Sequence, residues 1–373
     1  MLQTDCLNHS KPRGRKDPDL GGRAKSGIVC CTKQVEFNTI ASGFGHLGPI
    51  SGAIHRFVLQ ELNRADLLKN LPDNDALAGI CSGMLDAWKM YNNPAAVVLF
   101  VVEDRTYNIC DQRFHEFEIR RLNPQVTVVR KSLTQIYNLG HLDSNKKLIV
   151  DDHEVAVVYF RAGYEPSHYH GQKEWDARLM MERSMAIKCP SIHYHLAGTK
   201  KVQQALAQPN ILEKYLKDAK TVEMVRDTFT GLYSLDFTKE GEEAIEMAIK
   251  NPEKYVLKPQ REGGGNNVYG KEIRDKVIEM RNSEERMGWI LMDRIFPPVQ
   301  ASYIIRPGTE CKFDHLQDIV SELGIFGCII GDKDKVYINR QAGHMFRTKP
   351  STANEGGVAG GVGCLDSPFL VDI

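Results

Sequence analysis

The chain has 373 residues, enough for two or three domains and a substantial core. Hydrophobic residues make up 42% of the sequence and charged residues 26%, which are the proportions of a globular protein. The 48 basic and 48 acidic residues balance, and this excludes the overall positive field of a typical nucleic-acid or anionic-membrane binder. Any anion must therefore be recognised by a local cluster of charges.

The cysteine pattern and the length of the apolar runs indicate in which cellular compartment the protein works. The nine cysteines form neither a disulfide framework nor a CxxC zinc pattern, which favours a reducing compartment. The longest apolar run, residues 95–102, is far shorter than the ~18 residues of a membrane span, and no apolar signal segment opens the chain. We expect a cytoplasmic protein with no nucleic-acid or membrane partner.

Residues 1–32 combine glycine, proline and basic residues without a periodic pattern. This composition predicts a disordered or weakly structured tail. The basic cluster at residues 11–16 also permits interpretation as a nuclear-localisation signal, but such a short cluster favours a solvated polar tail.

Regular structure is expected from residue 33. Residues 33–40 alternate in strand fashion and place Glu36 and Asn38 on one face, and residues 49–66 and 73–91 have helical spacing. Glu36 and Asn38 suit two interpretations, either hard-oxygen ligands of one metal ion or the solvated face of a strand.

From residue 95 the pattern alternates between strands and helices, with strands at 95–103, 126–130, 147–150 and 155–160 and a helix at 111–122. Such alternation predicts a parallel βαβ domain over residues 97–198. Ligands bind beyond the carboxyl ends of parallel strands, so Arg161, Gly163 and Tyr164 are site candidates. Asn108 and Gln112 either bind a polar ligand or cap the helix.

The C-terminal half is expected to contain further helices up to residue 250, a helix at 271–282 and strands at 289–295 and 301–306. Residues 319–330 and 336–341 flank a turn-like segment, which predicts a β-hairpin.

The strongest chemical signal lies at residues 255–270, where an apolar run ends in Lys258 and precedes Glu262, three glycines and two asparagines. A lysine at a strand end supplies a fixed cation, glycines let backbone N–H groups approach an anion, and Glu262 offers an oxygen to Mg²⁺. Because the lysine comes before the glycines, the P-loop and dinucleotide motifs are excluded. The alternatives are an unusual phosphate site and a ligand-free surface hairpin.

Arg347 and Lys349 precede a second glycine-rich segment, residues 355–363, and suit either an anion or an edge strand protected by charge. Two HxH motifs, beginning at His168 and His193, could supply four imidazoles to a zinc ion. We do not favour a zinc site, because the first motif lies in a polar loop and no carboxylate or cysteine pattern accompanies it.

Several long motifs occur along the chain: KQVEFNTIASGFG from residue 33, DQR at 111–113, YFRAGY, MERSMAIKCPSI with LAGTKKVQQ, VLKPQREGGGNNVYG, SELGIFG, and MFRTKP with GGVAGGVG. In content and order they resemble the eukaryotic-type glutathione synthetase family over residues 33–370. The resemblance implies an α/β ATP-grasp fold with an inserted parallel βαβ substrate-binding domain and a glycine-rich lid. Residues 33–96 would begin the catalytic body, residues 97–198 would form the substrate domain, and residues 199–373 would form the ATP-grasp domain.

The resemblance also implies a homodimeric ligase that joins γ-glutamylcysteine to glycine with ATP and Mg²⁺ through an acyl phosphate, giving glutathione, ADP and phosphate. Lys258 and Arg347 would be catalytic, and Glu36, Asn38 and Glu262 would bind the metal. The ATP site would comprise Glu36, Lys200, Lys258, Glu262, Gly263, Gly264, Gly265, Asn266, Asn267, Tyr269, Met292, Asp293, Arg294, Ile295, Glu322, Lys349 and Glu355. The substrate site would comprise Ile40, Ala41, Ser42, Gly43, Thr106, Tyr107, Asn108, Gln112, Arg161, Ala162, Gly163, Tyr164, Arg347, Val358 and Ala359.

Two features depart from the family pattern. Ala41 and Gly43 stand where some members carry serines, which leaves backbone contacts at these positions. Residues 1–32 do not resemble the family's N-terminal region, which includes a substrate-holding arginine, and this indicates a shortened chain. The alternatives to an active enzyme of this kind are a non-catalytic isoform that binds nucleotide or a full-length subunit, and a related ATP-grasp ligase with another amino-acid acceptor.

Overall fold

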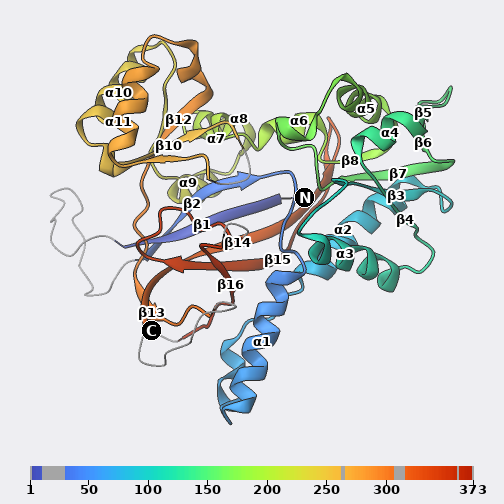
Figure 1. The fold of residues 1–373 in the computed structure, drawn as a ribbon, viewed down its shortest axis with the longest axis horizontal. Coiled ribbons are helices and arrows are strands. Elements are labelled where there is room, and N and C mark those ends of the chain that lie inside the picture. Colours follow the sequence, from blue (N-terminus) through green and yellow to red (C-terminus); the bar gives the residue numbers. More distant parts are fainter. Residues whose placement is uncertain (1, 11–29, 262–264, 306–315, 359–360, 372–373) are drawn as a thin grey trace.

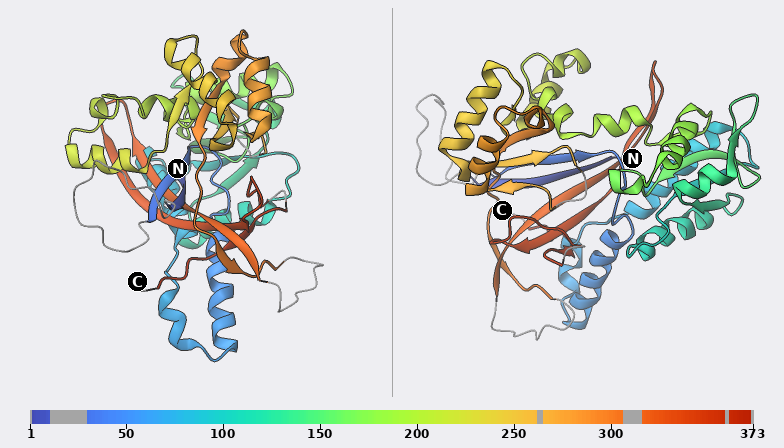
Figure 2. Two further views of the ribbon diagram at one scale, coloured as in Figure 1. Left: turned by 90° about the vertical axis from the view of Figure 1, so that its left-hand side faces the viewer. Right: turned by 45° about the horizontal axis from the view of Figure 1, so that its top comes forward.

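The computed structural model describes residues 2–10, 30–261, 265–305, 316–358 and 361–371, which form a mixed α/β fold with three sheets (Figure 1). A four-stranded sheet with α10 and α11 lies at one end of the molecule, a long antiparallel sheet lies in the middle, and a largely parallel sheet lies at the other end. Figure 2 shows that α1 projects from this body.

The central sheet is antiparallel throughout, with strand order β16-β15-β14-β1-β2, and β13 also pairs with β14. Its strands are β1 (Leu2–Ser10), β2 (Cys30–Asn38), β13 (Gln300–Ser302), β14 (Gln317–Gly331), β15 (Val336–Pro350) and β16 (Cys364–Asp366). Glu322 stands opposite Arg347 in the β14–β15 hairpin, so the register itself brings these opposite charges together.

The parallel sheet has the order β4-β3-β7-β6-β5, with β8 beside β7, and its pairs β3–β4, β3–β7 and β7–β8 are parallel. Every residue of β3 is buried, as expected for a strand covered on both faces. The elements of this region are β3 (Val97–Val101), α3 (Ile109–Leu122), β4 (Val128–Lys131), α4 (Leu133–Leu139), β5 (Gly140–Leu142), β6 (Leu148–Val150), β7 (His153–Phe160), η2 (Pro166–His168), α5 (Gln172–Arg183) and β8 (Ile187–Cys189).

The four-stranded sheet is antiparallel with the order β11-β10-β12-β9. Its strands are β9 (Leu232–Ser234), β10 (Tyr255–Pro259), β11 (Val268–Tyr269) and β12 (Trp289–Asp293). The neighbouring helices are α6 (Ile192–Ala197), α7 (Lys200–Leu206), α8 (Leu212–Tyr215), α9 (Ala219–Thr228), α10 (Lys239–Lys250), η3 (Pro252–Lys254), α11 (Lys271–Glu279) and η4 (Glu284–Gly288). Leu257 and Leu291 pack with Ile245 and Ile273 into a separate apolar core.

Helix α2 (Ala76–Tyr91) connects two of the sheets. Its buried residues Ile80 and Met84 belong to one apolar cluster with Phe100 of the parallel sheet and Phe326 of the central hairpin. Helices α1 (Leu47–Glu61) and η1 (Ala65–Asn70) precede it. The packing of α2 therefore supports β14 and β15, the strands that carry Glu322 and Arg347.

Parallel pairing is confirmed for the strands predicted at 95–103, 126–130 and 155–160, and the hairpin at 319–341 is confirmed. The strand predicted at 147–150 is β6, which pairs antiparallel with β5 and β7 because it reaches β7 through a tight turn. Strand β15 continues to Pro350, so the separately noted Arg347 and Lys349 lie on the hairpin itself. The helix predicted over 49–66 ends earlier, at Glu61, because Asn63 adopts a left-handed conformation with φ of 56° and a 3₁₀ turn follows. The strand predicted over 301–306 is limited to Gln300–Ser302 within the described residues.

The prediction of a weakly structured segment over residues 1–32 is wrong for Leu2–Ser10. This stretch forms β1 between β2 and β14, where pairing to two strands satisfies its backbone hydrogen bonds. The composition of residues 1–32 did not reveal this pairing, because β14 comes from the C-terminal half of the chain and most of β2 lies beyond residue 32. The basic cluster predicted at residues 11–16 lies outside the described residues.

Within the described ranges, no helix has both the length and the apolar character that crossing a bilayer requires.

The contact between α2 and β15 gives a test of this packing. A Cβ added at Gly79 of α2 would lie 2.5 Å from the backbone oxygen of Ala342, whereas one at Gly52 of α1 would meet nothing nearer than 3.9 Å. We expect Gly79→Ala to lower the free energy of unfolding by about 1–3 kcal/mol through overpacking. Gly52→Ala should be neutral or stabilising by up to about 1 kcal/mol, because alanine favours helix. Denaturant unfolding measures both, and equal effects of the two substitutions would contradict the packing.

Candidate active site

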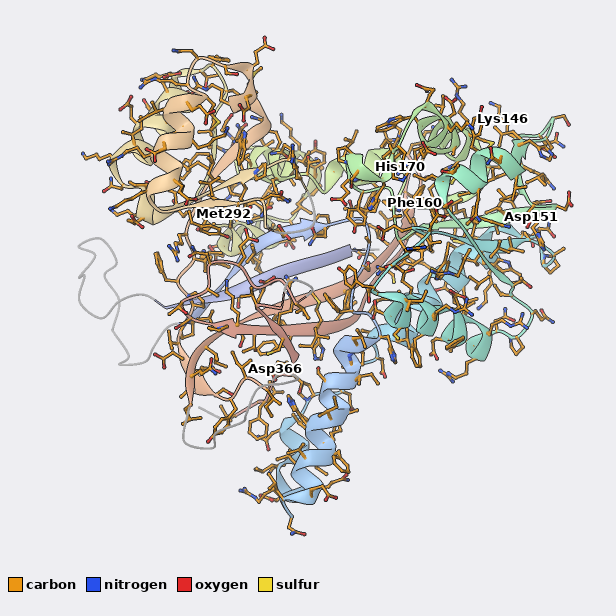
Figure 3. The ribbon with its side chains drawn as sticks, in the orientation of Figure 1. Lys146, Asp151, Phe160, His170, Met292 and Asp366 are labelled. Carbon is orange, nitrogen blue, oxygen red and sulfur yellow. The ribbon has the colours of Figure 1, made fainter. Side chains whose placement is uncertain are left out.

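A cavity of about 690 Å³ receives residues from all three sheets. Its walls come from β2 and the turn that follows it, the loops after β3 and β7, the strands β10 and β12, and the hairpin β14–β15 with the segment after it. Figure 3 labels Met292, which lines the cavity from β12, and Phe160, the last residue of strand β7 in the parallel sheet, after which Arg161 lines the cavity.

A buried charge cluster lies on one side of the cavity. The Glu36 carboxylate Oε2 lies 3.8 Å from the Nζ of Lys200 and 3.8 Å from the Nζ of Lys258. Both lysines are buried, and Lys258 Nζ donates to the Val35 oxygen at 3.2 Å while Lys200 Nζ donates to the Arg261 oxygen at 2.9 Å. The cluster therefore joins the central sheet, helix α7 and the four-stranded sheet at one point.

The ionisation of Glu36 follows from these neighbours. Burial by itself would raise the pKa of the Glu36 carboxyl, but the ammonium groups of Lys258 and Lys200 and a hydrogen bond from Asn38 lower it to about 2. Asn38 Nδ2 lies 3.3 Å from Glu36 Oε1. Glu36 is thus a fixed anion between two cations, and the interpretation of Glu36 and Asn38 as a solvated strand face does not hold.

Two more cations face the cavity from β15. Arg347 pairs with the Glu322 carboxylate, and Lys349 Nζ donates to the Asn354 oxygen at 2.7 Å. Burial lowers the pKa of the Lys349 ammonium. Because β15 lies between β14 and β16, the alternative of an edge strand protected by charge is excluded.

The described parts of the two glycine-rich segments contact each other. The Glu355 carboxylate accepts hydrogen bonds from the backbone N–H groups of Gly265 and of Asn267, the latter at 3.3 Å. Asn267 Nδ2 donates to the Tyr269 hydroxyl at 3.3 Å, and burial, with Glu355 nearby, raises the pKa of Tyr269 to about 12. Backbone N–H groups that bind a carboxylate in this way also suit a phosphate.

A second buried pair organises the opposite side of the cavity. The fully buried Asp111 carboxylate accepts backbone N–H bonds from Phe44 at 2.9 Å, His46 at 3.0 Å and Leu47 at 3.2 Å. Arg161 Nη2 lies 3.8 Å from Asp111 Oδ2, and its Nη1 donates to the Ser42 oxygen at 2.6 Å. Asp111 therefore fixes both the turn at 42–47 and the Arg161 side chain.

Amide side chains lie beside Arg161. Gln112 is buried and its Oε1 accepts from Arg130 Nη2 at 2.8 Å, which leaves the Nε2 amide group as the donor for a ligand. Asn108 occupies the N-cap position of α3 but its side chain makes no capping hydrogen bond. The interpretation of the Asn108 side chain as a helix cap is therefore wrong, and Asn108 lines the cavity instead.

The cavity gathers most of the residues proposed from the sequence. The predicted residues that line it are Glu36, Asn38, Ile40, Ala41, Gly43, Thr106, Tyr107, Asn108, Gln112, Arg161, Tyr164, Lys200, Lys258, Asn266, Asn267, Tyr269, Met292, Asp293, Arg294, Ile295, Glu322, Arg347, Lys349, Glu355 and Val358. Four predicted residues stand beside it without lining it: Ser42, Ala162, Gly163 and Gly265. Four predictions, Glu262, Gly263, Gly264 and Ala359, lie outside the described residues.

Other lining residues were not proposed from the sequence. They are Val35, Phe44, Glu103, Glu165, Val256, Arg261, Phe296, Pro297, Val299, Val320, Ser351, Ala353, Asn354, Gly356 and Gly357. Some adjoin a quoted motif, as Arg261 adjoins the glycine run, and the positions of Glu103 and Glu165 after parallel strands were a usable signal. The apolar residues carried no such signal, because an apolar side chain that lines a cavity cannot be told by spacing from one that packs in a core.

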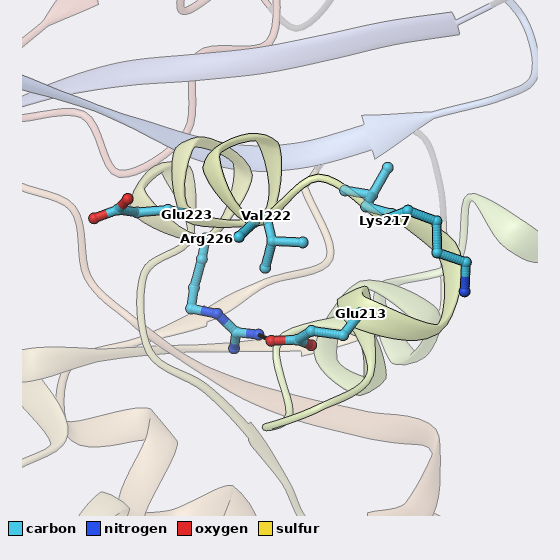
Figure 4. A pocket seen from close by; sticks show the side chains of 7 residues that line it. Glu213, Lys217, Val222, Glu223 and Arg226 are labelled. Atoms are coloured by element: carbon cyan, nitrogen blue, oxygen red, sulfur yellow. Dashed lines mark hydrogen bonds and ion pairs between the residues drawn. The ribbon is translucent and has the colours of Figure 1, made fainter.

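A second hollow of about 470 Å³ lies between α8 and α9 (Figure 4). Arg226 and Glu213 pair across it at 2.8 Å, and none of its lining residues belongs to the predicted site. Its surface ion pair and the absence of buried cations among its lining residues make it a poor match for an anionic substrate.

Comparison with known proteins identifies relatives of the chain. The family profile described as "Eukaryotic glutathione synthase, ATP binding domain" matches residues 15–370. The chain is 46% identical to the glutathione synthetase of Xenopus laevis over 340 residues, covering 91% of this chain and 70% of that protein. It is 43% identical to the Homo sapiens glutathione synthetase over 340 residues, with the same two coverages. The chloroplastic glutathione synthetase of Solanum lycopersicum is 44% identical over 343 residues, covering 91% of this chain and 61% of that protein.

A solved structure shares the fold. The apo form of a glutathione synthetase-like effector, GSS30, from Globodera pallida superposes with a TM-score of 0.75 over 99% of this chain and 75% of that chain. Its sequence identity is 23%, so the likeness concerns the fold alone.

The low pKa of Glu36 predicts a pH dependence of stability. A carboxyl whose pKa falls from its ordinary 4.5 to about 2 on folding contributes stability that is fully present above about pH 4.5. This contribution, about 3 kcal/mol, is lost as the pH falls from 4.5 to 2. We therefore expect the difference in unfolding free energy between the wild type and Glu36→Gln to shrink over this window.

Denaturant unfolding between pH 6 and 2 measures this difference. Glu213→Gln, which removes a surface carboxylate paired with Arg226, is the matched control and should change stability by less than about 1 kcal/mol. A wild-type advantage over Glu36→Gln that stays constant with pH would contradict the charge cluster.

Proposed function

The chain belongs to the eukaryotic glutathione synthase family, and from this we propose that it joins γ-glutamylcysteine to glycine with ATP, giving glutathione, ADP and phosphate. The observation that carries the proposal is the single cavity in which four cations, Lys200, Lys258, Arg347 and Lys349, meet the amide-lined pocket beside Arg161. A phosphate-rich nucleotide needs the first group, and a polar dipeptide needs the second.

The reaction would proceed through an acyl phosphate. ATP would phosphorylate the cysteinyl carboxylate of γ-glutamylcysteine, and the glycine amine would then attack the acyl carbon and release phosphate. Charge would spread over the phosphoryl oxygens in the first step, so fixed cations are the main catalytic requirement and no protein nucleophile is needed.

Each cation has a proposed task. Lys258 and Lys200, held in place by backbone oxygens and Glu36, would bind the phosphates of ATP. Arg347, oriented by Glu322, would hold the donor carboxylate beside the transferred phosphoryl group. Lys349, whose ammonium pKa is lowered by burial, would neutralise the same group.

Glu36 and Asn38 fit Mg²⁺ chemically, because they offer an ionised carboxylate and an amide oxygen to a cavity that would also receive phosphates. Glu262, proposed as a further ligand, lies outside the described residues. When bound, Mg²⁺ would neutralise phosphate oxygens and favour the in-line geometry.

We further propose that the two glycine-rich segments form the lid of an ATP-grasp site. The hydrogen bonds from Gly265 and Asn267 to Glu355 support this, because they join two segments distant in sequence, and Asn267 and Glu355 both line the cavity. Division into residues 33–96, 97–198 and 199–373, and assembly as a homodimer, are proposed from the family resemblance.

The central test is glycine-dependent turnover. Purified protein with γ-glutamylcysteine, glycine, ATP and Mg²⁺ should release ADP and form glutathione, and omission of glycine should stop product formation. Substituting β-alanine for glycine in the same assay tests the alternative of another acceptor. Folded protein that binds ATP without glycine-dependent turnover would instead support the non-catalytic isoform.

Removal of the Lys258 charge should abolish most of this activity. We expect Lys258→Met to reduce kcat by about a hundredfold or more, because a charge that stabilises the phosphoryl transition state is lost. Lys254→Met, on the neighbouring turn η3 and outside the cavity, is the matched control and should retain activity. Comparable rates for the two variants would contradict the role of Lys258.

Magnesium dependence tests the metal proposal. Chelation by EDTA should stop turnover, and Asn38→Ala should raise the Mg²⁺ concentration for half-maximal rate by about tenfold or more, because a metal ligand is removed. Asn145→Ala, an exposed position in the parallel-sheet domain, should leave the Mg²⁺ titration unchanged. Superimposable Mg²⁺ titrations of Asn38→Ala and wild type would refute the assignment.

A further inference from the structure

Two carboxylates, Glu103 and Glu165, line the end of the cavity that also contains Arg161. They follow the strands β3 and β7, which pair in parallel, so the fold brings the two loops together at the carboxyl ends of these strands. Their side chains are 38% and 39% exposed, which leaves both carboxylates accessible from the cavity.

The two carboxylates converge on one imidazole. His168 Nε2 lies 3.5 Å from Glu103 Oε1 and 3.5 Å from Glu165 Oε1. The backbone N–H of Gly163 donates to His168 Nδ1 at 2.9 Å, so Nδ1 is an acceptor and the proton of a neutral ring sits on Nε2. Ser167 Oγ donates to Glu165 Oε1 at 2.8 Å, and this donor is also neutral.

Neutral donors do not cancel the charge of this pair. The negative charge of Glu103 and Glu165 also acts on Tyr164, which lines the cavity. Burial is the largest cause that raises the pKa of the Tyr164 hydroxyl, and these two carboxylates raise it further. The cation of this region, Arg161, donates to the Ser42 oxygen and lies 3.8 Å from Asp111, so part of its charge is balanced by another carboxylate. This end of the cavity therefore offers both a buried guanidinium and a negative pair.

A zwitterion matches this arrangement. The γ-glutamyl group of the proposed donor ends in an α-ammonium and an α-carboxylate on one carbon. The opposite end of the same donor carries the carboxylate that would react, and this end belongs beside Lys258 and Arg347. The γ-glutamyl end must then face Arg161, Glu103 and Glu165, which line the other part of the cavity.

We propose that Glu103 and Glu165 bind the α-ammonium of the donor while Arg161 binds its α-carboxylate, so that this chain selects donors with a free α-amino group. The proposal rests on the proposed function and adds the residues that determine donor specificity. The pair shares the cavity with the buried Arg161 and with the side-chain amide of Gln112, whose Oε1 already accepts from Arg130.

The experiment compares two donors that differ only in the group concerned. Glutarylcysteine is γ-glutamylcysteine without the α-ammonium, and it retains both carboxylates and the thiol. Steady-state kinetics with each donor would be measured for wild type, Glu103→Gln, Glu165→Gln, the double variant and Asp104→Asn. Asp104 is the matched control, since it is exposed, adjacent to Glu103 and outside the cavity lining.

We expect the double variant to lose about tenfold to a hundredfold in kcat/KM for γ-glutamylcysteine, mainly through KM, because a charge-assisted contact to the ammonium is lost. Wild type should show a similar deficit with glutarylcysteine, and the double variant should lose little more with that donor. KM for ATP and glycine should not change, and Asp104→Asn should behave as wild type. Equal losses with both donors, or no loss with γ-glutamylcysteine, would overturn the proposal.

Calorimetry separates failure of the recognition from failure of the proposed reaction. Binding of γ-glutamylcysteine that is tighter than binding of glutarylcysteine, and that loses this preference in the double variant, would support the recognition even if no glutathione forms. Turnover without this preference would overturn the recognition and leave the reaction standing. Absence of binding of either donor to wild type would overturn both.

Discussion

The site depends on one half-buried carboxylate, Glu36, between the buried ammonium groups of Lys200 and Lys258. Glu36 comes from the central sheet, Lys200 from the start of α7 and Lys258 from the four-stranded sheet, so their attraction holds three separate elements at one point. Two buried lysines without an anion would carry a large desolvation cost, and Glu36 offsets it. The same lysines line the cavity proposed for the nucleotide, where they would face its phosphates.

A buried carboxylate, Asp111, fixes the part of the cavity that contains Arg161. Asp111 holds the turn at 42–47 through three backbone N–H groups and keeps Arg161 beside Ser42. This turn is the direct continuation of the strand that carries Glu36 and Asn38. One short segment, residues 36–47, is therefore anchored by charge at both ends, and it connects the phosphate side of the cavity with the donor side.

The strand β15, which carries Arg347 and Lys349, is held in place by packing rather than by charge. Helix α2 places its glycine-containing face against β15 and fills the core between the central hairpin and the parallel sheet. Thr348, between Arg347 and Lys349, points away from the cavity into hydrogen bonds with Ser321 and Asp366 at 2.8 Å each. The two cations of β15 are thus presented by a strand fixed on its opposite face.

Much of this could be predicted from residues alone. The period of two in the first strand put Glu36 and Asn38 on one face, the buried run ending at Phe160 identified Arg161 and Tyr164, and the order of lysine and glycines at 258–265 excluded the common nucleotide motifs. These are local properties, because side-chain direction along a strand and the backbone freedom of glycine are set by neighbours in the chain. The tertiary structure decided what spacing cannot express: that Leu2–Ser10 is a strand between β2 and the distant β14, that Asp111 fixes the turn at 42–47, and that Glu103 and Glu165 converge on His168. The physical reason is that each of these needs at least one partner far away in sequence, β14 for the first strand, Asp111 for the turn and Glu103 for His168, and a pairing energy exists only once the fold has brought the partners together.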